Sequence, residues 1–169
     1  MDDVNRPGLA RMLGISQYRI RDFDNAIQWL TKATAADKED AEAYLYLGYC
    51  QINKTKIAEA EKSFKTAFHL DNSETIKQEA IDELMEIGEL SLSLGENFIA
   101  QGAEPRGYEF KKLGIRIMAF ALEFSKYDLE LAEKIQKYAI ATKDQILIDW
   151  IANVILAEKE GPQTIEIQL

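Results

Sequence analysis

The strongest constraint on the fold of this chain is an internal repeat with a period of 34 residues. Shifting the sequence by that period superimposes six identical residues: Leu13-Gly14 on Leu47-Gly48, Gln17 on Gln51, Ala26 on Ala60, Ala33 on Ala67 and Asp37 on Asp71. Two similar pairs keep the same register, Phe23 with Ile57 and Leu30 with Phe64. A repeat of this length is typical of architectures in which each unit packs on the next.

Each repeat predicts two helices, because apolar residues recur at spacings of three and four, as in Ala26, Leu30 and Ala33. Polar breaks at Arg21-Asp22 and Lys54-Thr55-Lys56 separate the helices of each pair. The expected ranges are 8–20 and 24–36 in the first repeat, and 41–53 and 57–70 in the second. Small residues are expected where two helices cross, because larger ones would hold the axes apart: Gly14, Ala26, Ala33, Gly48, Ala60 and Ala67.

This pattern resembles the tetratricopeptide repeat family, whose unit is a 34-residue helix–turn–helix hairpin. The matching residues are Leu13-Gly14, Ala26, Leu30 and Ala33 in residues 7–40, and Tyr44, Leu47-Gly48, Ala60, Phe64 and Ala67 in residues 41–74. The chain departs from the family pattern at Ala10, where a bulky residue is usual, and at Gln17 and Gln51, where an aromatic is usual. No proline closes either unit. The resemblance implies an α-solenoid of stacked hairpins over residues 1–74.

Residues 75–160 keep the helical character and lose the period. The first part of this region allows two structures: a turn near Gly95, or one long helix over 75–101. We favour the long helix. Three more helices are expected near 107–125, 127–142 and 144–159. The sequence therefore predicts an all-α protein in which divergent helices extend and cap the stack.

The final segment, 161–169, begins with Gly161-Pro162 and then alternates apolar and polar residues. Two interpretations remain for this tail. It is disordered, or Ile165, Ile167 and Leu169 dock on this chain or on a neighbouring one.

Composition argues against catalysis and metal binding. With one cysteine, Cys50, and one histidine, His69, the chain has neither a disulfide framework nor a multi-cysteine or histidine-rich metal site. It shows no nucleophile motif and no glycine-rich phosphate loop. We therefore expect no enzyme activity, no cofactor and no metal.

Charge bears on the kind of partner. The formal net charge is −9, which disfavours nucleic acid and anionic membranes as partners. Residues 1–74 hold ten basic and twelve acidic side chains (net −2), whereas residues 75–169 hold ten and seventeen (net −7). The acidic side chains of residues 79–86 form either a solvated face or a rim that selects a basic partner. A basic group, Lys111, Lys112 and Arg116, is expected on a solvated face.

The N-terminal residues are acidic and polar, which is unlike a secretory signal, and they favour a cytoplasmic location. The most apolar stretches, 115–124 and 146–156, are too short to span a bilayer, and each carries a charge. No membrane insertion is expected.

The candidate binding residues lie on the first helix of each repeat, on the side not committed to its hairpin partner: Arg11, Met12, Ile15, Tyr18, Arg19, Leu45, Tyr46, Tyr49, Ile52 and Asn53. Tyrosines beside aliphatic residues suit peptide capture. The alternative is that these residues pack between adjacent units. A carboxylate clamp, which some members of the family use, is disfavoured because Ile15 and Tyr46 stand where clamp asparagines are expected.

The predicted function is a non-enzymatic protein–protein interaction module that binds a peptide segment of a partner protein in a concave groove, as an adaptor or assembly factor. The alternatives are a chaperone for a secretion or assembly client, a self-assembling scaffold or homo-oligomer, and an enzyme or ligand-binding module in the divergent half.

Overall fold

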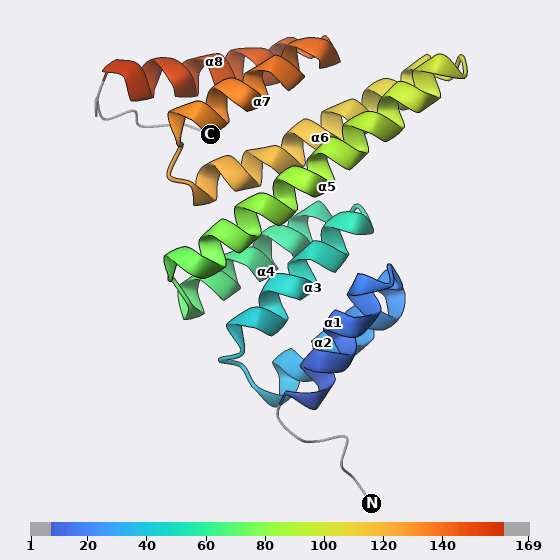
Figure 1. Cartoon of the computed structure of the whole chain (residues 1–169), viewed down its shortest axis with the longest axis vertical. Helices are drawn as coiled ribbons and strands as arrows, with labels where there is room; N and C mark the ends of the chain where they lie inside the picture. The colour runs from blue at the N-terminus through green and yellow to red at the C-terminus, as the bar shows by residue number, and fades with distance from the viewer. Residues whose placement is uncertain (1–7, 161–169) are drawn as a thin grey trace, which may run out of the picture. The chain divides into compact units, whose positions relative to one another are not determined.

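The computed structural model describes residues 8–160, and every regular element in that range is an α-helix (Figure 1). The helices are α1 (Leu9–Arg19), α2 (Phe23–Ala36), α3 (Ala41–Asn53), α4 (Ile57–Leu70), α5 (Glu74–Ala100), α6 (Glu104–Phe124), α7 (Leu129–Thr142) and α8 (Gln145–Glu160). The predicted all-α class is confirmed. The predicted tail at 161–169 lies outside the described residues.

The chain forms two compact units, which divide within α5 between Ala80 and Ile81. Unit 1 contains α1–α4 and the start of α5. Unit 2 contains the rest of α5 and α6–α8.

Unit 1 consists of two successive helical hairpins, α1–α2 and α3–α4, as the repeat predicts (Figure 1). The polar breaks form the turns, where Arg21 and Thr55 adopt the left-handed conformation at φ 63° and 59°. Aspartates cap α2 and α3, since the Asp22 carboxylate accepts the Asn25 N–H at 3.3 Å and Asp40 accepts the Ala43 N–H at 3.0 Å. α2 and α4 begin and end 34 residues apart, so the period of the sequence is also the period of the structure.

A glycine on the first helix of each hairpin receives a large side chain from the second helix. A Cβ atom added to Gly14 would lie 2.5 Å from Leu30 Cγ, and one added to Gly48 would lie 2.5 Å from the Phe64 ring. Leu30 and Phe64 are completely buried in consequence. The expectation that these small residues mark helix crossings is confirmed.

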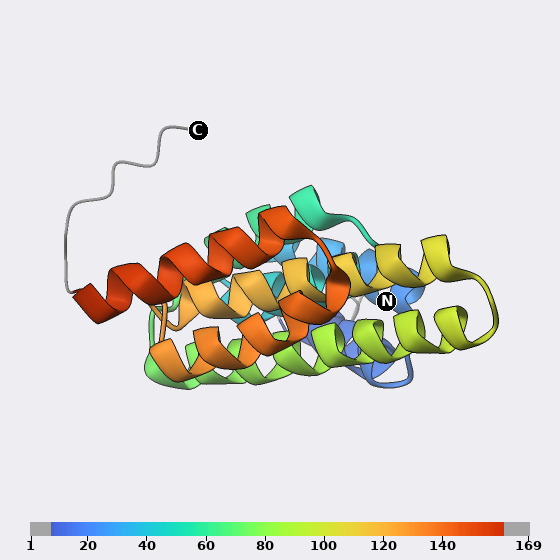
Figure 2. The same cartoon turned by 90° about the horizontal axis from the view of Figure 1, so that it is seen from above.

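Unit 2 is built around the α5–α6 hairpin, whose two long helices run side by side to a turn at Gly102 (Figure 2). The favoured long helix is confirmed, and α5 passes Gly95 without a turn. Gly95 instead lies against the backbone of α6, because its added Cβ would meet the Gly107 carbonyl oxygen at 2.6 Å. α6 begins earlier than expected, at Glu104, because a proline is tolerated in the first turn of a helix.

Candidate functional site

The candidate site is the side of unit 1 formed by the first helices of the hairpins. We call it the first-helix face. It consists of the residues of the predicted groove that remain exposed or half-buried on α1 and α3, without the half-buried Arg11, which is paired with Asp40: Met12, Ile15, Tyr18, Arg19, Tyr46 and Asn53. The structure brings residues that are 34 positions apart in the sequence onto one side of unit 1, because equivalent helices of successive hairpins lie next to each other.

An aromatic cluster forms the floor of this face. The Tyr18 ring lies 5.5 Å from Tyr46 and 5.9 Å from both Phe23 and Tyr49, measured between ring centroids. Tyr46 meets Tyr49 edge to face at 5.4 Å, and Tyr49 lies 5.7 Å from Phe64. Edge-to-face pairs of this kind fix the rings relative to one another. The rings of Tyr18 and Tyr46 are thus held in place and remain partly open to solvent.

Three residues of the predicted groove do not reach the surface. Leu45, Tyr49 and Ile52 are at most 1% exposed, so these side chains pack within the protein and offer no surface to a partner. The physical reason is the position of α3, which packs against α1, α2 and α4 and is therefore covered on several sides. The sequence holds a signal for this, since α3 is apolar around most of its circumference, as a buried helix is.

Arg11 connects the first hairpin to the second through ion pairs. Its guanidinium lies 3.0 Å from the buried carboxylate of Asp40 and 3.2 Å from Glu42. The hydrogen bond to Asp40 raises the pKa of Arg11 above its ordinary value. Because Asp40 also caps α3, Arg11 is engaged in holding the start of that helix.

Tyr46 lies between groups of opposite charge at the edge of the face. Its hydroxyl donates to Glu79 Oε1 at 3.2 Å. Burial and the Glu79 charge raise the pKa of Tyr46, and Arg19 acts in the opposite direction. In the sequence, Glu79 belongs only to the acidic stretch of residues 79–86, which the structure places on α5. No local pattern connects it to Tyr46, which lies 33 positions away.

Two large apolar side chains in and directly after α1 are open to solvent. Met12 is 66% exposed and Ile20, directly after α1, is 70% exposed. Ile20 was not among the predicted groove residues, because it falls at the end of the predicted helix. Asn53 turns its amide back to the Tyr49 carbonyl oxygen at 2.9 Å, which leaves the apolar groups as the main contact area.

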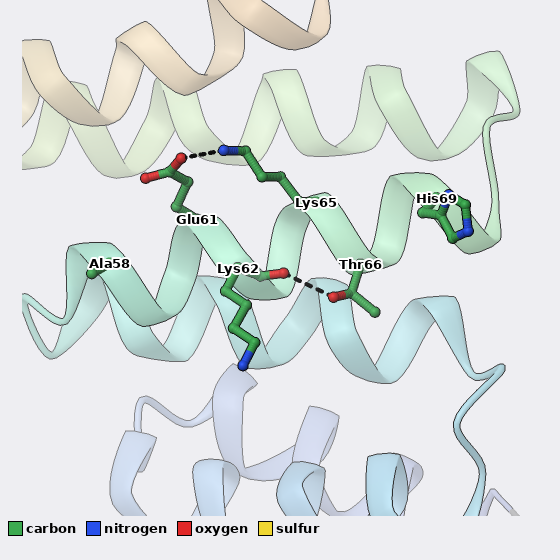
Figure 3. Close-up of a pocket in the computed structure, with 6 residues that line it drawn as sticks. All are labelled: Ala58, Glu61, Lys62, Lys65, Thr66 and His69. Carbon is green, nitrogen blue, oxygen red and sulfur yellow. Dashed lines mark hydrogen bonds and ion pairs between the residues drawn. The ribbon is translucent and has the colours of Figure 1, made fainter. Parts of the chain in front are cut away.

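The opposite side of unit 1 has a shallow hollow of about 470 Å³ on α4, lined by Ala58, Glu61, Lys62, Lys65, Thr66 and His69 (Figure 3). All six residues belong to one helix. Glu61 pairs with Lys65, and the Thr66 hydroxyl donates to the Lys62 carbonyl oxygen at 2.9 Å. The hollow is thus the outward side of a single helix, along which Glu61 and Lys65 form an ion pair.

A smaller hollow of about 180 Å³ lies in unit 2 beside Lys111 and Glu96. The expectation that Lys111 lies on a solvated face is wrong. It is 9% exposed, and its ammonium lies 3.5 Å from Glu96 Oε1. The physical reason is Gly95, because its missing side chain lets the Lys111 stem lie against α5. Cys50 is buried, and burial raises the pKa of its thiol to about 12.

In the described part of the chain, no three histidine, cysteine, aspartate or glutamate side chains are grouped so that they could hold a metal ion. Over the same residues, no helix combines the length and the apolar character needed to cross a bilayer.

Comparisons with known proteins add little to this description. No protein-family model matches the chain. No curated protein matches it either. Among solved structures, the chain is similar to the MamA RS-1 ArsTM double mutant, with 16% identity and a TM-score of 0.41 over 95% of this chain and 97% of that one. It is also similar to PilF of Pseudomonas aeruginosa, with 13% identity and a TM-score of 0.40 over 96% of this chain and 79% of that one. Neither similarity is close enough to argue from, so the description of the fold rests on the helices themselves.

Proposed function

We propose that the chain is a protein-interaction module that binds a peptide segment of a partner protein on the first-helix face, as an adaptor or assembly factor. The observation that carries this proposal is the exposure of Met12 and Ile20 on, or directly after, the helix that also carries Tyr18, whose half-buried ring contacts that of Tyr46. Exposed apolar side chains next to fixed aromatic rings are the usual anchors of protein interfaces.

The edge of the face adds selectivity. Arg19 is exposed, and Glu79 accepts the Tyr46 hydroxyl, so a bound peptide meets both signs of charge within a short distance. Ring contacts hold Tyr18 and Tyr46 in place before binding, so these side chains lose less conformational entropy when a partner binds.

The test is affinity capture from a lysate with matched baits. Met12→Glu/Ile20→Glu places two charges on the first-helix face, and Ala35→Glu/Ala58→Glu places two charges on exposed positions of α2 and α4. The two variants have the same net charge, and circular dichroism checks that both keep the helical content of the wild type. A partner recovered with wild type and the α2/α4 variant, and lost with the first variant, supports the proposal.

The recovered partner then gives the peptide for a direct binding measurement. Loss of apolar anchors weakens binding by roughly 30-fold, about 2 kcal/mol. Equal affinity for both variants, or a larger loss with Ala35→Glu/Ala58→Glu, contradicts the proposed surface.

The chaperone alternative predicts a different result with the same proteins. A chaperone suppresses the aggregation of its unfolded client and releases the folded client, whereas an adaptor binds the folded partner. The scaffold alternative predicts a mass that rises with protein concentration in light scattering.

A further inference from the structure

The last described helix, α8, is apolar around most of its circumference. Ile151 and Ile155 are buried, and α8 packs on α7. A second apolar stripe runs along another side of the helix at spacings of four, four and three residues, through Ile146, Trp150, Val154 and Ala157. Ile146 is 81% exposed, and the other three are half-buried. We call these four residues the α8 stripe.

A helix that is apolar on all sides normally has neighbours on all sides. Leaving apolar surface in water costs about 25 cal/mol per Å². The exposed Ile146 and the half-buried rest of the stripe therefore leave apolar surface that an occupant would cover.

The sequence that follows α8 has the chemistry and the length to be that occupant. Gly161-Pro162 favours a change of chain direction directly after the helix. In extended backbone, alternate side chains lie on the same edge, so Ile165, Ile167 and Leu169 share one edge, and Thr164, Glu166 and Gln168 share the other.

The lengths also agree. α8 has 16 residues, which span about 24 Å at the helical rise of about 1.5 Å per residue. The nine residues 161–169 reach about 30 Å when extended, at roughly 3.3 Å per residue. The segment is thus long enough to return along the helix as far as Ile146.

We propose that residues 163–169 bind in extended form along the α8 stripe, antiparallel to α8, with Ile165, Ile167 and Leu169 against the helix. Attachment to the end of α8 gives the segment an effective concentration near the millimolar range, which favours it over a separate chain.

The first experiment measures the exposure of Trp150, with Trp29→Phe removing the other tryptophan. In the full chain, Ile165→Ser/Ile167→Ser/Leu169→Ser removes the apolar edge, and Thr164→Ser/Glu166→Ser/Gln168→Ser changes the polar edge as the matched control. The first variant is expected to raise acrylamide quenching of Trp150 by about twofold, and the control is expected to leave it unchanged. Equal quenching in both variants and the parent overturns the proposal.

The second experiment determines whether the segment runs antiparallel to α8 and whether it belongs to the same chain. Cys50 is buried, so Thr164→Cys and Gln168→Cys each provide one reactive site for a spin label. The label at 164 is expected to broaden the amide signals near Ala157, and the label at 168 those near Ile146. The opposite order, or no broadening in α8, overturns the proposal. A mixed sample tests the source of the segment: isotope-labelled chains without a spin label are combined with spin-labelled chains that carry no isotope. Broadening of the α8 signals in this sample also overturns the proposal, because a second copy would then be the occupant.

Discussion

Both units of the molecule place glycine where helices cross, and they do so in different ways. In unit 1, Gly14 and Gly48 each receive a side chain, Leu30 or Phe64, from the partner helix. In unit 2, the glycines of α5 and α6 face one another across the hairpin, and an added Cβ would meet a backbone carbonyl oxygen at 2.5–3.0 Å at each of Gly88, Gly95, Gly107 and Gly114. The glycines of each helix are seven residues apart, so the contact recurs every two turns.

The difference teaches how each region tolerates change. In unit 1 the space beside each glycine is occupied by a side chain, and a smaller side chain there would make room for a Cβ atom at the glycine. A backbone carbonyl cannot be shortened, so in unit 2 any side chain at a facing glycine forces the helices apart. The sequence shows both kinds of glycine in similar helical settings, and only the partner atom distinguishes them.

The largest effect is expected from Gly95→Ala. Its Cβ would lie 2.6 Å from the Gly107 carbonyl oxygen, and overpacking of this kind costs about 3 kcal/mol, well above the gain of about 1 kcal/mol from the helix propensity of alanine. Asn97→Ala, at an exposed position of the same helix, is the control and is expected to be neutral or slightly stabilising. Urea unfolding followed by circular dichroism measures both. A stabilised Gly95→Ala variant would show that the two backbones are not in close contact.

A smaller effect, with a rescue, is expected in unit 1. Gly48→Ala is predicted to cost about 2 kcal/mol because its Cβ would overlap the Phe64 ring. Adding Phe64→Leu to this variant is expected to recover about 1 kcal/mol relative to the sum of the single changes.

Lys111→Ala in the Gly95→Ala background is the matching control, because the Lys111 stem also lies near Gly95. It is expected to recover nothing, since the Gly107 carbonyl stays in place. Equal recovery in the two cycles would remove the distinction between the two regions.

The smallest effect concerns a feature that the units share. Tyr46 donates to Glu79 in unit 1, and Tyr138 donates to Glu89 in unit 2 at 3.1 Å. Burial, with the nearby carboxylate, raises the pKa of both phenols above its ordinary value. The unfolded chain therefore releases these protons first, so the stability that they contribute is complete below the unfolded pKa and is lost as the pH rises through the folded pKa.

Tyr46→Phe and Tyr138→Phe are each expected to cost about 0.5–1 kcal/mol at pH 7 through the lost hydrogen bond, and to reduce the loss of stability at alkaline pH. Urea unfolding at pH 7 and at about pH 10.5 measures both effects. An alkaline loss that is as steep in both variants as in wild type would show that these phenols do not report on folding.

The fold could be predicted from the sequence wherever its signal is local. The hairpin turns at Arg21 and Thr55 follow from short polar breaks, and the hole at Gly48 follows from a small residue set opposite an aromatic one. Gly95 shows where local reasoning stops, because glycine next to polar residues is as typical of a turn as of a close helix contact. The nearness of Gly107 on the next helix distinguishes the two.

The candidate site was less predictable than the fold. Met12 and Tyr49 both lie on first helices among apolar neighbours, yet Met12 is exposed and Tyr49 is buried. The difference arises because α3 has helices on several sides, and α1 begins the described stack. Glu79 joins Tyr46 only through folding, and no spacing rule links them.

The sequence by itself determined the 34-residue period, the helices and the small residues at their crossings, because helical hydrogen bonds and side-chain periodicity depend on residues three or four positions apart. The tertiary structure decided which first-helix residues remain on the surface, that Lys111 is buried against Gly95, and that α5 continues past that glycine. These outcomes depend on which atoms of distant segments arrive at the same place, and burial is a property of that arrangement rather than of any one residue.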